Sequence, residues 1–294
     1  MKINYTFIIP HKNSHELLYR CINSIPVRDD IQIIVIDDNS ENQYFECLIL
    51  QQHNVKLLLS DHNLGAGGAR NMGLDYAKGK WVLFADADDY YTSGFIDVLD
   101  KYLDTDNDIV FFDIDDSQNP KITFKKYHKA ICNQSVNDIQ YLKYGMTNVW
   151  CKMFKLSLIT KYNIKFECTK RGNDILFTLL TSHFSQKILV IKNKLYNYSY
   201  SPTSITFSNH LFQDYIDIYK RHLKYNSFVS FIGANEFKWS FVDFFLHKLK
   251  YFGLKKTIKF WLYVVIHSNE FKLCKNYYIK IYKLCVAFKN KSEF

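Results

Sequence analysis

The chain of 294 residues is long enough to bury a large core in one domain or two, and its 17% aromatic content excludes a disordered protein. Its seven cysteines include no Cys-x-x-Cys pair and no Cys/His cluster at zinc spacing, which is typical of reduced thiols in the cytoplasm. The net charge of +9 lies wholly in residues 206–294, which hold 15 basic and 6 acidic residues, whereas residues 1–205 are neutral.

The sequence shows no secretory signal and no membrane-spanning segment. Its first ten residues lack the long apolar stretch and the small-residue cleavage site of a signal peptide. The longest apolar run, Phe260–Ile266, is far below the roughly 20 residues that cross a bilayer. We therefore expect a cytoplasmic protein.

The first elements are a strand, a loop and a helix. Tyr5–Ile9 is an apolar run that predicts a buried strand, stopped by Pro10. Asn13 followed by Glu16 predicts a helix cap, and apolar residues recur at helical spacing over Leu17–Ile25.

Two further strands each lead into polar residues. Ile31–Ile36 is an apolar run that ends in Asp37 and Asp38, and a third predicted strand spans Val55–Leu59. A glycine-rich loop follows the third strand, and a helix is predicted over Met72–Ala77.

The stretch from Lys80 to Tyr91 carries the clearest chemical signal. Trp81–Ala85 predicts a strand buried on both faces, and carboxylates follow at its end. Side chains of an extended backbone alternate, so Asp86 and Asp88 point to one side while Ala87 keeps the spacing open. Two carboxylates suit Mg²⁺ or Mn²⁺, which also bind phosphate oxygens. Acids after a strand also occur in a plain solvated turn. The rest of the sequence therefore has to show whether these acids belong to a binding site.

The neighbouring segments favour a binding site. Four strands alternating with helices in about 90 residues predict a parallel α/β sheet, whose ligands lie beyond the carboxyl ends of its strands. Pro10–His11, Asp37–Asp38 and Asp86–Asp88 all follow strand ends. We expect these segments to converge on one crevice.

The rest of the chain divides into a continuation of this domain and a helical region. We expect residues 1–205 to form one domain in two halves, over 1–115 and 116–205, followed by a helical region over 206–294. The elements expected after residue 94 are a helix over 95–103, strands over 108–114, 121–127 and 189–198, and helices that follow 148–155 and 171–174.

Four motifs in this order resemble the inverting family 2 glycosyltransferases, which have the GT-A fold. The motifs are Ile8-Ile-Pro-His-Lys-Asn13, Asp37-Asp-Asn-Ser40, Asn63-Leu-Gly-Ala-Gly-Gly-Ala-Arg-Asn-Met-Gly73 and Gly79-Lys-Trp-Val-Leu-Phe-Ala-Asp-Ala-Asp-Asp89. The resemblance covers residues 1–115 strongly and 148–205 more weakly. It implies that the half over 1–115 binds the nucleotide sugar and that the half over 116–205 binds the acceptor. It implies a GT-A domain of α/β class, with a mostly parallel sheet flanked by helices, and a C-terminal helical extension rich in basic and aromatic residues.

The resemblance also implies roles for individual residues. Asp38, beside Asp37, would accept a hydrogen bond from the nucleotide base, and Arg70 would lie near the base and diphosphate. Asp86 would contact the ribose and, with Asp88, hold Mn²⁺ or Mg²⁺ against the donor phosphates. The residues implied to bind the nucleotide sugar are Pro10, His11, Asn13, Asp37, Asp38, Asn63, Gly68, Arg70, Asp86, Ala87 and Asp88.

An inverting transfer also needs a base that removes the proton of the acceptor hydroxyl. By resemblance this base is Asp174, although the family more often has Glu where this chain has Asn173. Trp150 and Lys152 would lie on the acceptor side. Asp174 could instead be a helix N-terminal acid that interacts with the macrodipole, and His11 a plain turn residue.

The implied function is transfer of a sugar from a UDP-linked donor to a saccharide or lipid-linked saccharide, in the assembly of a surface polysaccharide. A sugar nucleotidyltransferase would instead carry a Gly-rich loop after the first strand, and a dehydrogenase a third glycine in Gly65–Arg70. A catalytically inactive relative that binds membrane or nucleic acid is a further alternative.

Aromatic residues make up 23 of the 89 residues over 206–294. Lysines beside aromatics predict a peripheral contact with an anionic membrane, at the inner face of the plasma membrane. A helical subdomain with a solvated basic face is the alternative, and no nucleic-acid motif accompanies the charge.

Overall fold

The computed structural model describes residues 2–41, 54–117, 122–199 and 212–292, in two compact units over 1–204 and 205–294. Each unit has its own set of elements and is described by itself. Within the described ranges, no helix is both long and apolar enough to cross a membrane.

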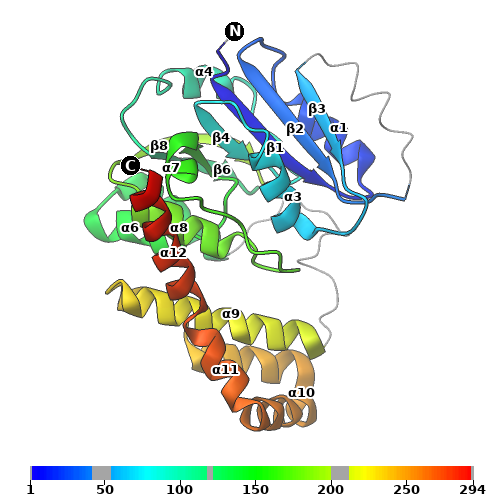
Figure 1. Cartoon of the computed structure of the whole chain (residues 1–294), viewed down its shortest axis with the longest axis vertical. Coiled ribbons are helices and arrows are strands. Elements are labelled where there is room, and N and C mark those ends of the chain that lie inside the picture. Colours follow the sequence, from blue (N-terminus) through cyan, green and yellow to red (C-terminus); the bar gives the residue numbers. More distant parts are fainter. Residues whose placement is uncertain (1, 42–53, 118–121, 200–211, 293–294) are drawn as a thin grey trace. The chain divides into compact units, whose positions relative to one another are not determined.

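Unit 1 is built on an eight-stranded sheet of order β3-β2-β1-β4-β7-β6-β8-β5 (Figure 1). The strands β1 to β4 pair in parallel, β6 pairs in parallel with β8, and β7 and β5 run antiparallel to their neighbours. The strands are β1 (Tyr5–His11), β2 (Ile31–Asp37), β3 (Val55–Leu59), β4 (Trp81–Phe84), β5 (Tyr90–Tyr91), β6 (Ile109–Asp115), β7 (Lys152–Lys155) and β8 (Ile188–Asn197).

Helices cover both faces of the sheet. On one face α3 lies so close that a Cβ at Gly73 would meet the side chains of Ile8 and Ile36 at 2.6 and 2.9 Å. Phe84, in register with Ile8, packs on the same face against Phe177 of α8. The helices of unit 1 are α1 (His15–Asn23), α3 (Gly65–Leu74), α4 (Phe95–Asp100), α5 (Ile122–Asn133), α6 (Val136–Gln140), a π-helix (Tyr141–Gly145), α7 (Leu156–Lys161) and α8 (Ile175–Phe184).

The strand register brings the predicted polar segments together. His11 pairs with Asp37 at the ends of β1 and β2, and Ala85, just before the acids, donates its N–H to the Ile8 carbonyl at 3.2 Å. The α/β class and the sheet flanked by helices are therefore confirmed.

Two predictions for the second half of unit 1 were wrong. Residues 121–127 were expected to form a strand, but Ile122–Asn133 is a helix whose Phe124, Tyr127 and Ile131 are buried at helical spacing. Lys152–Lys155, expected only to lead into a helix, is the strand β7. Its four residues have a lysine at each end, so no apolar run marks it.

Two helix starts also differ from the prediction. Asn13 does not cap α1; it has a left-handed φ of 52°, and its side-chain oxygen accepts the Glu41 N–H at 2.9 Å. Helix α3 begins at Gly65, seven residues earlier than expected. The carboxylate of Asp38 accepts the N–H groups of Leu64 and Gly65, so a distant acid caps a helix that glycine content disfavours.

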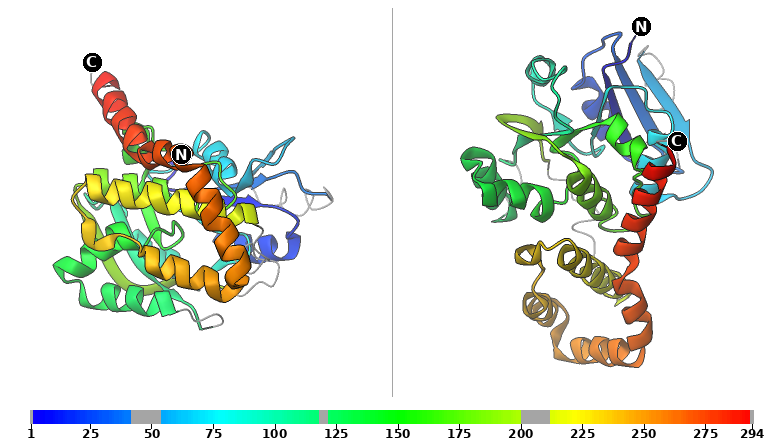
Figure 2. Two further views of the ribbon diagram at one scale, coloured as in Figure 1. Left: turned by 90° about the horizontal axis from the view of Figure 1, so that it is seen from below. Right: turned by 60° about the vertical axis from the view of Figure 1, so that its left-hand side comes forward.

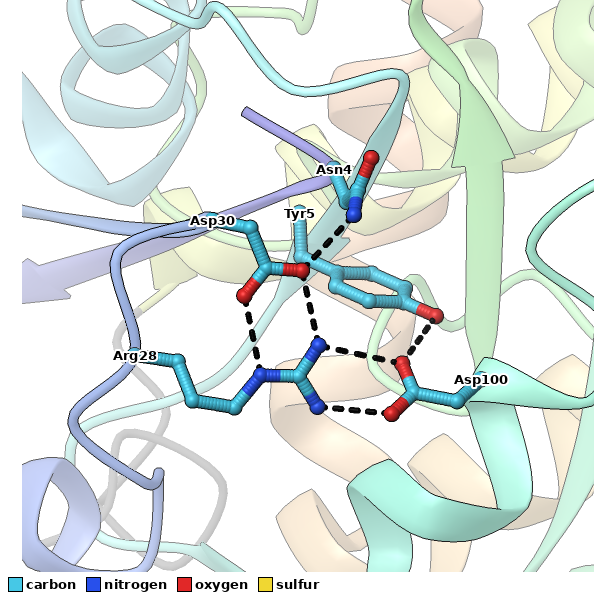
Figure 3. A network of polar contacts seen from close by, with 5 residues as sticks. All are labelled: Asn4, Tyr5, Arg28, Asp30 and Asp100. Carbon is cyan, nitrogen blue, oxygen red and sulfur yellow. Dashed lines mark hydrogen bonds and ion pairs between the residues drawn. The ribbon is translucent and has the colours of Figure 1, made fainter. Parts of the chain in front are cut away.

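A polar network ties β1 to α4 at the edge opposite the predicted site (Figure 3). Arg28 donates to both oxygens of Asp30, at 2.9 and 2.7 Å, and to Asp100 at 2.6 Å. Tyr5 donates its hydroxyl to Asp100 at 3.1 Å, and Asn4 donates to Asp30 at 2.7 Å. The hydrogen bonds from Arg28 are the largest cause of the lowered pKa of Asp30.

We expect Arg28→Ala to lower the free energy of unfolding by about 1 kcal/mol at pH 7, the upper range for a partly exposed, bidentate pair. Because the pKa of Asp30 is lowered in the folded state, this stabilisation is present above the unfolded pKa of about 3.9 and is lost as pH falls through the folded value. Urea unfolding at pH 7 and near pH 3 measures the difference. Lys80→Ala, which breaks the exposed pair with Asp104, is the control; a loss from Arg28→Ala as large at pH 3 as at pH 7 would contradict the account.

Unit 2 is helical in the part that the structure describes (Figures 1 and 2). Its core joins Tyr215, Tyr219 and Leu223 of α9 to Phe260 and Val264 of α10. The elements are α9 (Phe212–Phe231), a short 3-10 helix (Asn235–Phe237), α10 (Phe241–Ile266), α11 (Ser268–Lys275) and α12 (Tyr277–Ser292).

Candidate active site

Three carboxylates gather just beyond the end of β4. Asp86, Asp88 and Asp89 each place an oxygen within 4.8 Å of the others. Asp89 is buried, and its two oxygens accept the Ser199 N–H at 2.7 Å and the Tyr196 hydroxyl at 2.9 Å. Burial and the two neighbouring acids raise the pKa of Asp89 well above its usual range. Asp89 is therefore the structural member of the cluster.

Asp86 and Asp88 are only half-buried and present their carboxylates beside this anchor. Like charges held this close are unfavourable without a cation, and carboxylate oxygens are the ligands that Mg²⁺ and Mn²⁺ prefer. The donor set therefore fits a hard divalent cation on Asp86 and Asp88. The expected alternation of an extended strand is not what brings the acids together, because β4 ends at Phe84 and the buried Ala87 lies in a turn in which the Asp89 N–H donates to the Asp86 carbonyl at 3.0 Å.

Arg20 of α1 holds the loop that carries these acids. Its guanidinium donates to the backbone carbonyl of Asp88 and, at 3.1 Å, to the hydroxyl of Ser199, and it stacks over the Tyr90 ring at 4.6 Å. Ser199 also donates its N–H to Asp89. Three segments far apart in the sequence thus fix the acid cluster.

The ends of β1 and β2 form the neighbouring wall. Asp37 is buried and accepts hydrogen bonds from the backbone and hydroxyl of Ser40, so it shapes the turn after β2. Asp38 caps α3 with both oxygens, each of which keeps a lone pair for a further donor. Asn13 joins the turn after β1 to the turn after β2, because its N–H donates to the Ser40 hydroxyl at 2.9 Å.

His11 lies at the tip of β1, next to the half-buried Pro10. Its ring is buried, with Nε2 at 3.2 Å from Nδ1 of His15 and Nδ1 at 3.2 Å from the Ser14 hydroxyl. Burial, only partly offset by Asp37, lowers the pKa of His11 to about 4, so the ring is neutral at pH 7. Asn63 lies across this wall and accepts a hydrogen bond from Lys12.

Helix α3 links the acid cluster to the segment before α8. Arg70 is buried and donates to Asp86 at 2.5 Å and to the side chain of Asn173 at 2.7 Å. Asn71 bonds both backbone groups of Phe166, at 2.8 and 3.0 Å. A Cβ at Gly67 would lie 2.0 Å from the Glu167 carbonyl, so only glycine permits this approach.

Gly68 is the second small residue of this contact. A Cβ there would lie 2.9 Å from the Leu64 Cβ and 3.6 Å from the sulfur of Cys168. The side chains of Arg70 and Asn71 and the two glycines therefore fix the position of residues 166–173 against α3.

Asp174 follows this segment directly and is the N-cap residue of α8. It is half-buried, and its side chain makes no capping hydrogen bond to the helix. Its position at the start of α8 is also compatible with the alternative interpretation, an acid that interacts with the helix macrodipole. Arg70 joins Asp86 to Asn173, the residue before Asp174 in the chain.

Lys152 and Trp150 lie beneath the surface. Lys152 is fully buried and donates to the carbonyls of Met146, at 2.8 Å, and Asn148. Burial lowers the pKa of Lys152, while the charge of Asp174 opposes that shift. Trp150 is also buried and stacks parallel to Tyr196 at 5.5 Å. Their assignment to the acceptor side stays a prediction.

The structure brings most of the predicted residues to one edge of the sheet, and adds four that the sequence analysis missed. Asp89 could have been found, as the third acid of its motif. Arg20, Tyr196 and Ser199 had no signal, because their contacts with the cluster span 68 to 110 residues of sequence.

The sequence profile of the family described as Glycosyl transferase family 2 matches residues 6–169, which contain β1 to β7 and the acid cluster. The chain belongs to this family. Among curated proteins, it is 24% identical to the glycosyltransferase GlyA of Streptococcus pneumoniae over 210 residues, 66% of this chain and 30% of that protein. It is also 24% identical to the poly(ribitol-phosphate) beta-N-acetylglucosaminyltransferase TarS of Staphylococcus aureus over 209 residues, 67% of this chain and 35% of that protein. The chain thus spans about a third of the length of these relatives.

Two solved glycosyltransferase structures show the same fold. The S. aureus TarS fragment 1–349 in complex with UDP-GlcNAc superposes with a TM-score of 0.62 at 18% identity, covering 99% of this chain and 92% of the fragment. The mannosyltransferase PcManGT of Pyrobaculum calidifontis, in complex with GDP-Man and Mn²⁺, gives 0.54 at 13% identity over 100% and 89% of the chains. The expected GT-A fold is therefore confirmed.

Proposed function

We propose that this family 2 glycosyltransferase moves a sugar from a UDP-linked donor to a saccharide or lipid-linked saccharide acceptor, with inversion, and that it needs Mn²⁺ or Mg²⁺. The observation that carries the proposal is that Arg70 donates hydrogen bonds both to Asp86 and to Asn173, the residue before Asp174. This link supports a site that combines carboxylates for a cation with a carboxylate at a helix start, as a displacement reaction requires.

Each residue then has a task. The cation on Asp86 and Asp88, when bound, neutralises charge on the leaving diphosphate. Asp38 accepts a hydrogen bond from the base, and Arg70 keeps Asp86 oriented. Asp174 takes the proton of the acceptor hydroxyl while that oxygen bonds to the anomeric carbon, and the bond to the diphosphate breaks on the opposite face.

The choice of UDP rests on similarity. TarS was solved with UDP-GlcNAc, and an Escherichia coli protein, 32% identical over 89 residues, is named UDP-Glc:alpha-D-GlcNAc-diphosphoundecaprenol beta-1,3-glucosyltransferase WfgD. These 89 residues are 29% of this chain and 35% of WfgD. Both names support a role in bacterial surface polysaccharide synthesis, such as capsule, O-antigen or exopolysaccharide, and WfgD supports a lipid-linked acceptor. Because PcManGT was solved with GDP-Man, a GDP-sugar is the alternative donor against which a UDP-sugar should be tested.

The proposed place of action is the inner face of the plasma membrane, where a lipid-linked acceptor would be found. The supporting observation is the net charge of +9 in residues 206–294, which attracts an anionic surface. We propose a peripheral contact there.

Proton NMR of slow donor hydrolysis tests the reaction itself. The protein is incubated with Mn²⁺ and UDP-GlcNAc, UDP-Glc or GDP-Man, and the released sugar is observed before mutarotation. We expect release from a UDP-sugar as the β anomer, the inverse of the α linkage in the donor. Release of the α anomer would overturn inversion, and release from GDP-Man alone would overturn the donor class.

A further inference from the structure

Helix α10 of unit 2 exposes a continuous apolar stripe. Leu254, Ile258, Leu262 and Val265 recur at helical spacing, and each is between 51% and 68% exposed. With Thr257 and Trp261, these side chains line a shallow hollow of about 230 Å³ that is open to solvent. An exposed apolar stripe of this kind marks a contact surface.

The stripe is distinct from the face that builds the core of unit 2. Phe260 and Val264 are buried, and they lie on the side of α10 that packs on Tyr219 and its neighbours in α9. The exposed aliphatic side chains of α10 are therefore not part of the core of the unit.

Basic side chains border the stripe. Lys255 and Lys259, both exposed, lie one position after Leu254 and Ile258, which places them along one edge of the stripe. Over residues 254–292 the single acid is Glu270, which is paired with Lys220. The lysines of the same range are Lys255, Lys256, Lys259, Lys272, Lys275, Lys280, Lys283, Lys289 and Lys291.

We propose that the apolar stripe of α10 inserts into the surface of an anionic bilayer, with Lys255 and Lys259 against the lipid headgroups. Aliphatic side chains between lysines match a surface that is apolar below and negative above. Nucleic acid offers no partner for four exposed aliphatic residues. Two copies packed by this stripe would bring their lysine edges together without acids to balance them.

The proposed function includes a membrane contact somewhere in residues 206–294, and this proposal assigns that contact to the apolar stripe of α10. It does not depend on the transferase site. The full chain is centrifuged with vesicles of phosphatidylcholine, alone or mixed with phosphatidylglycerol. We expect binding to the anionic vesicles only. Ile258→Ser with Leu262→Ser should lower the partition coefficient about 100-fold, by loss of buried apolar area, and Lys255→Ala with Lys259→Ala about 25-fold.

Matched controls lie in unit 1. Val136→Ser, at a position 78% exposed, and Lys101→Ala with Lys125→Ala, both exposed, should leave vesicle binding unchanged. Circular dichroism and UDP binding check that every variant is folded, so failure of this proposal is distinguishable from failure of the proposed function.

Three results would overturn the proposal. They are no binding of the full chain to anionic vesicles, binding that the α10 variants leave intact, or a dimer by analytical ultracentrifugation that Ile258→Ser with Leu262→Ser dissociates. The last result would assign the stripe to a second copy of the chain. Binding to nucleic acid is tested in the same way with DNA and RNA oligonucleotides. Oligonucleotide binding that Lys255→Ala with Lys259→Ala abolishes, and that Ile258→Ser with Leu262→Ser leaves intact, would also overturn the proposal and would assign the basic edge to nucleic acid.

Discussion

Asp88→Asn is expected to lower the rate of sugar transfer about 1000-fold. The substitution keeps the size of the side chain but removes one of two negative ligands of the proposed cation, which stabilises the leaving diphosphate by several kcal/mol. Electron paramagnetic resonance of free Mn²⁺ should show weaker metal binding in the same variant. Donor hydrolysis followed by release of UDP measures the rate.

The control for Asp88→Asn is Asp97→Asn, which removes an exposed acid of α4 away from the cluster. It should leave both the rate and Mn²⁺ binding unchanged. If Asp88→Asn kept the wild-type rate at saturating Mn²⁺, the acid cluster would have no part in the chemistry.

Asp174→Asn is expected to lower kcat by about 1000-fold, within the range that general-base catalysis contributes. The amide cannot take the proton of the acceptor hydroxyl. Binding of UDP with Mn²⁺ should be unchanged, because Arg70 and Asp86 keep their contacts. Steady-state turnover and calorimetric binding on one preparation separate the two effects.

The competing interpretation of Asp174 is a helix N-terminal acid. In that case Asp174→Asn would cost at most about 1 kcal/mol of stability and would leave kcat intact. Asp138→Asn is the matched control, because Asp138 lies in the first turn of α6 and takes part in a capping box. We expect it to lower stability without lowering kcat.

The sheet and the site's acids could be predicted because their signals are local. Apolar runs mark β1, β2 and β4, and the acids stand directly after them, so parallel pairing alone brings His11, Asp37 and Asp86 to one edge. Helix α8 could also be predicted, from the apolar residues that follow Asp174.

The remaining features depend on contacts across the sequence. Helix α3 starts at Gly65 because Asp38 caps it, and no local propensity reports that acid. The buried position of Lys152 depends on the carbonyls of Met146 and Asn148 turning inward. Arg20 looks like an ordinary surface residue of α1 until its contact with Asp88 is formed.

The central claim is that this edge of the sheet binds a nucleoside diphosphate through a divalent cation. Calorimetric titration of the purified protein with UDP, GDP and CDP, each with Mn²⁺ and with a chelator, tests it most directly. We predict that UDP binds with Mn²⁺ and that the chelator abolishes this binding. If no nucleotide bound under any condition, the chain would be a family member without transferase activity, and the claim would be contradicted.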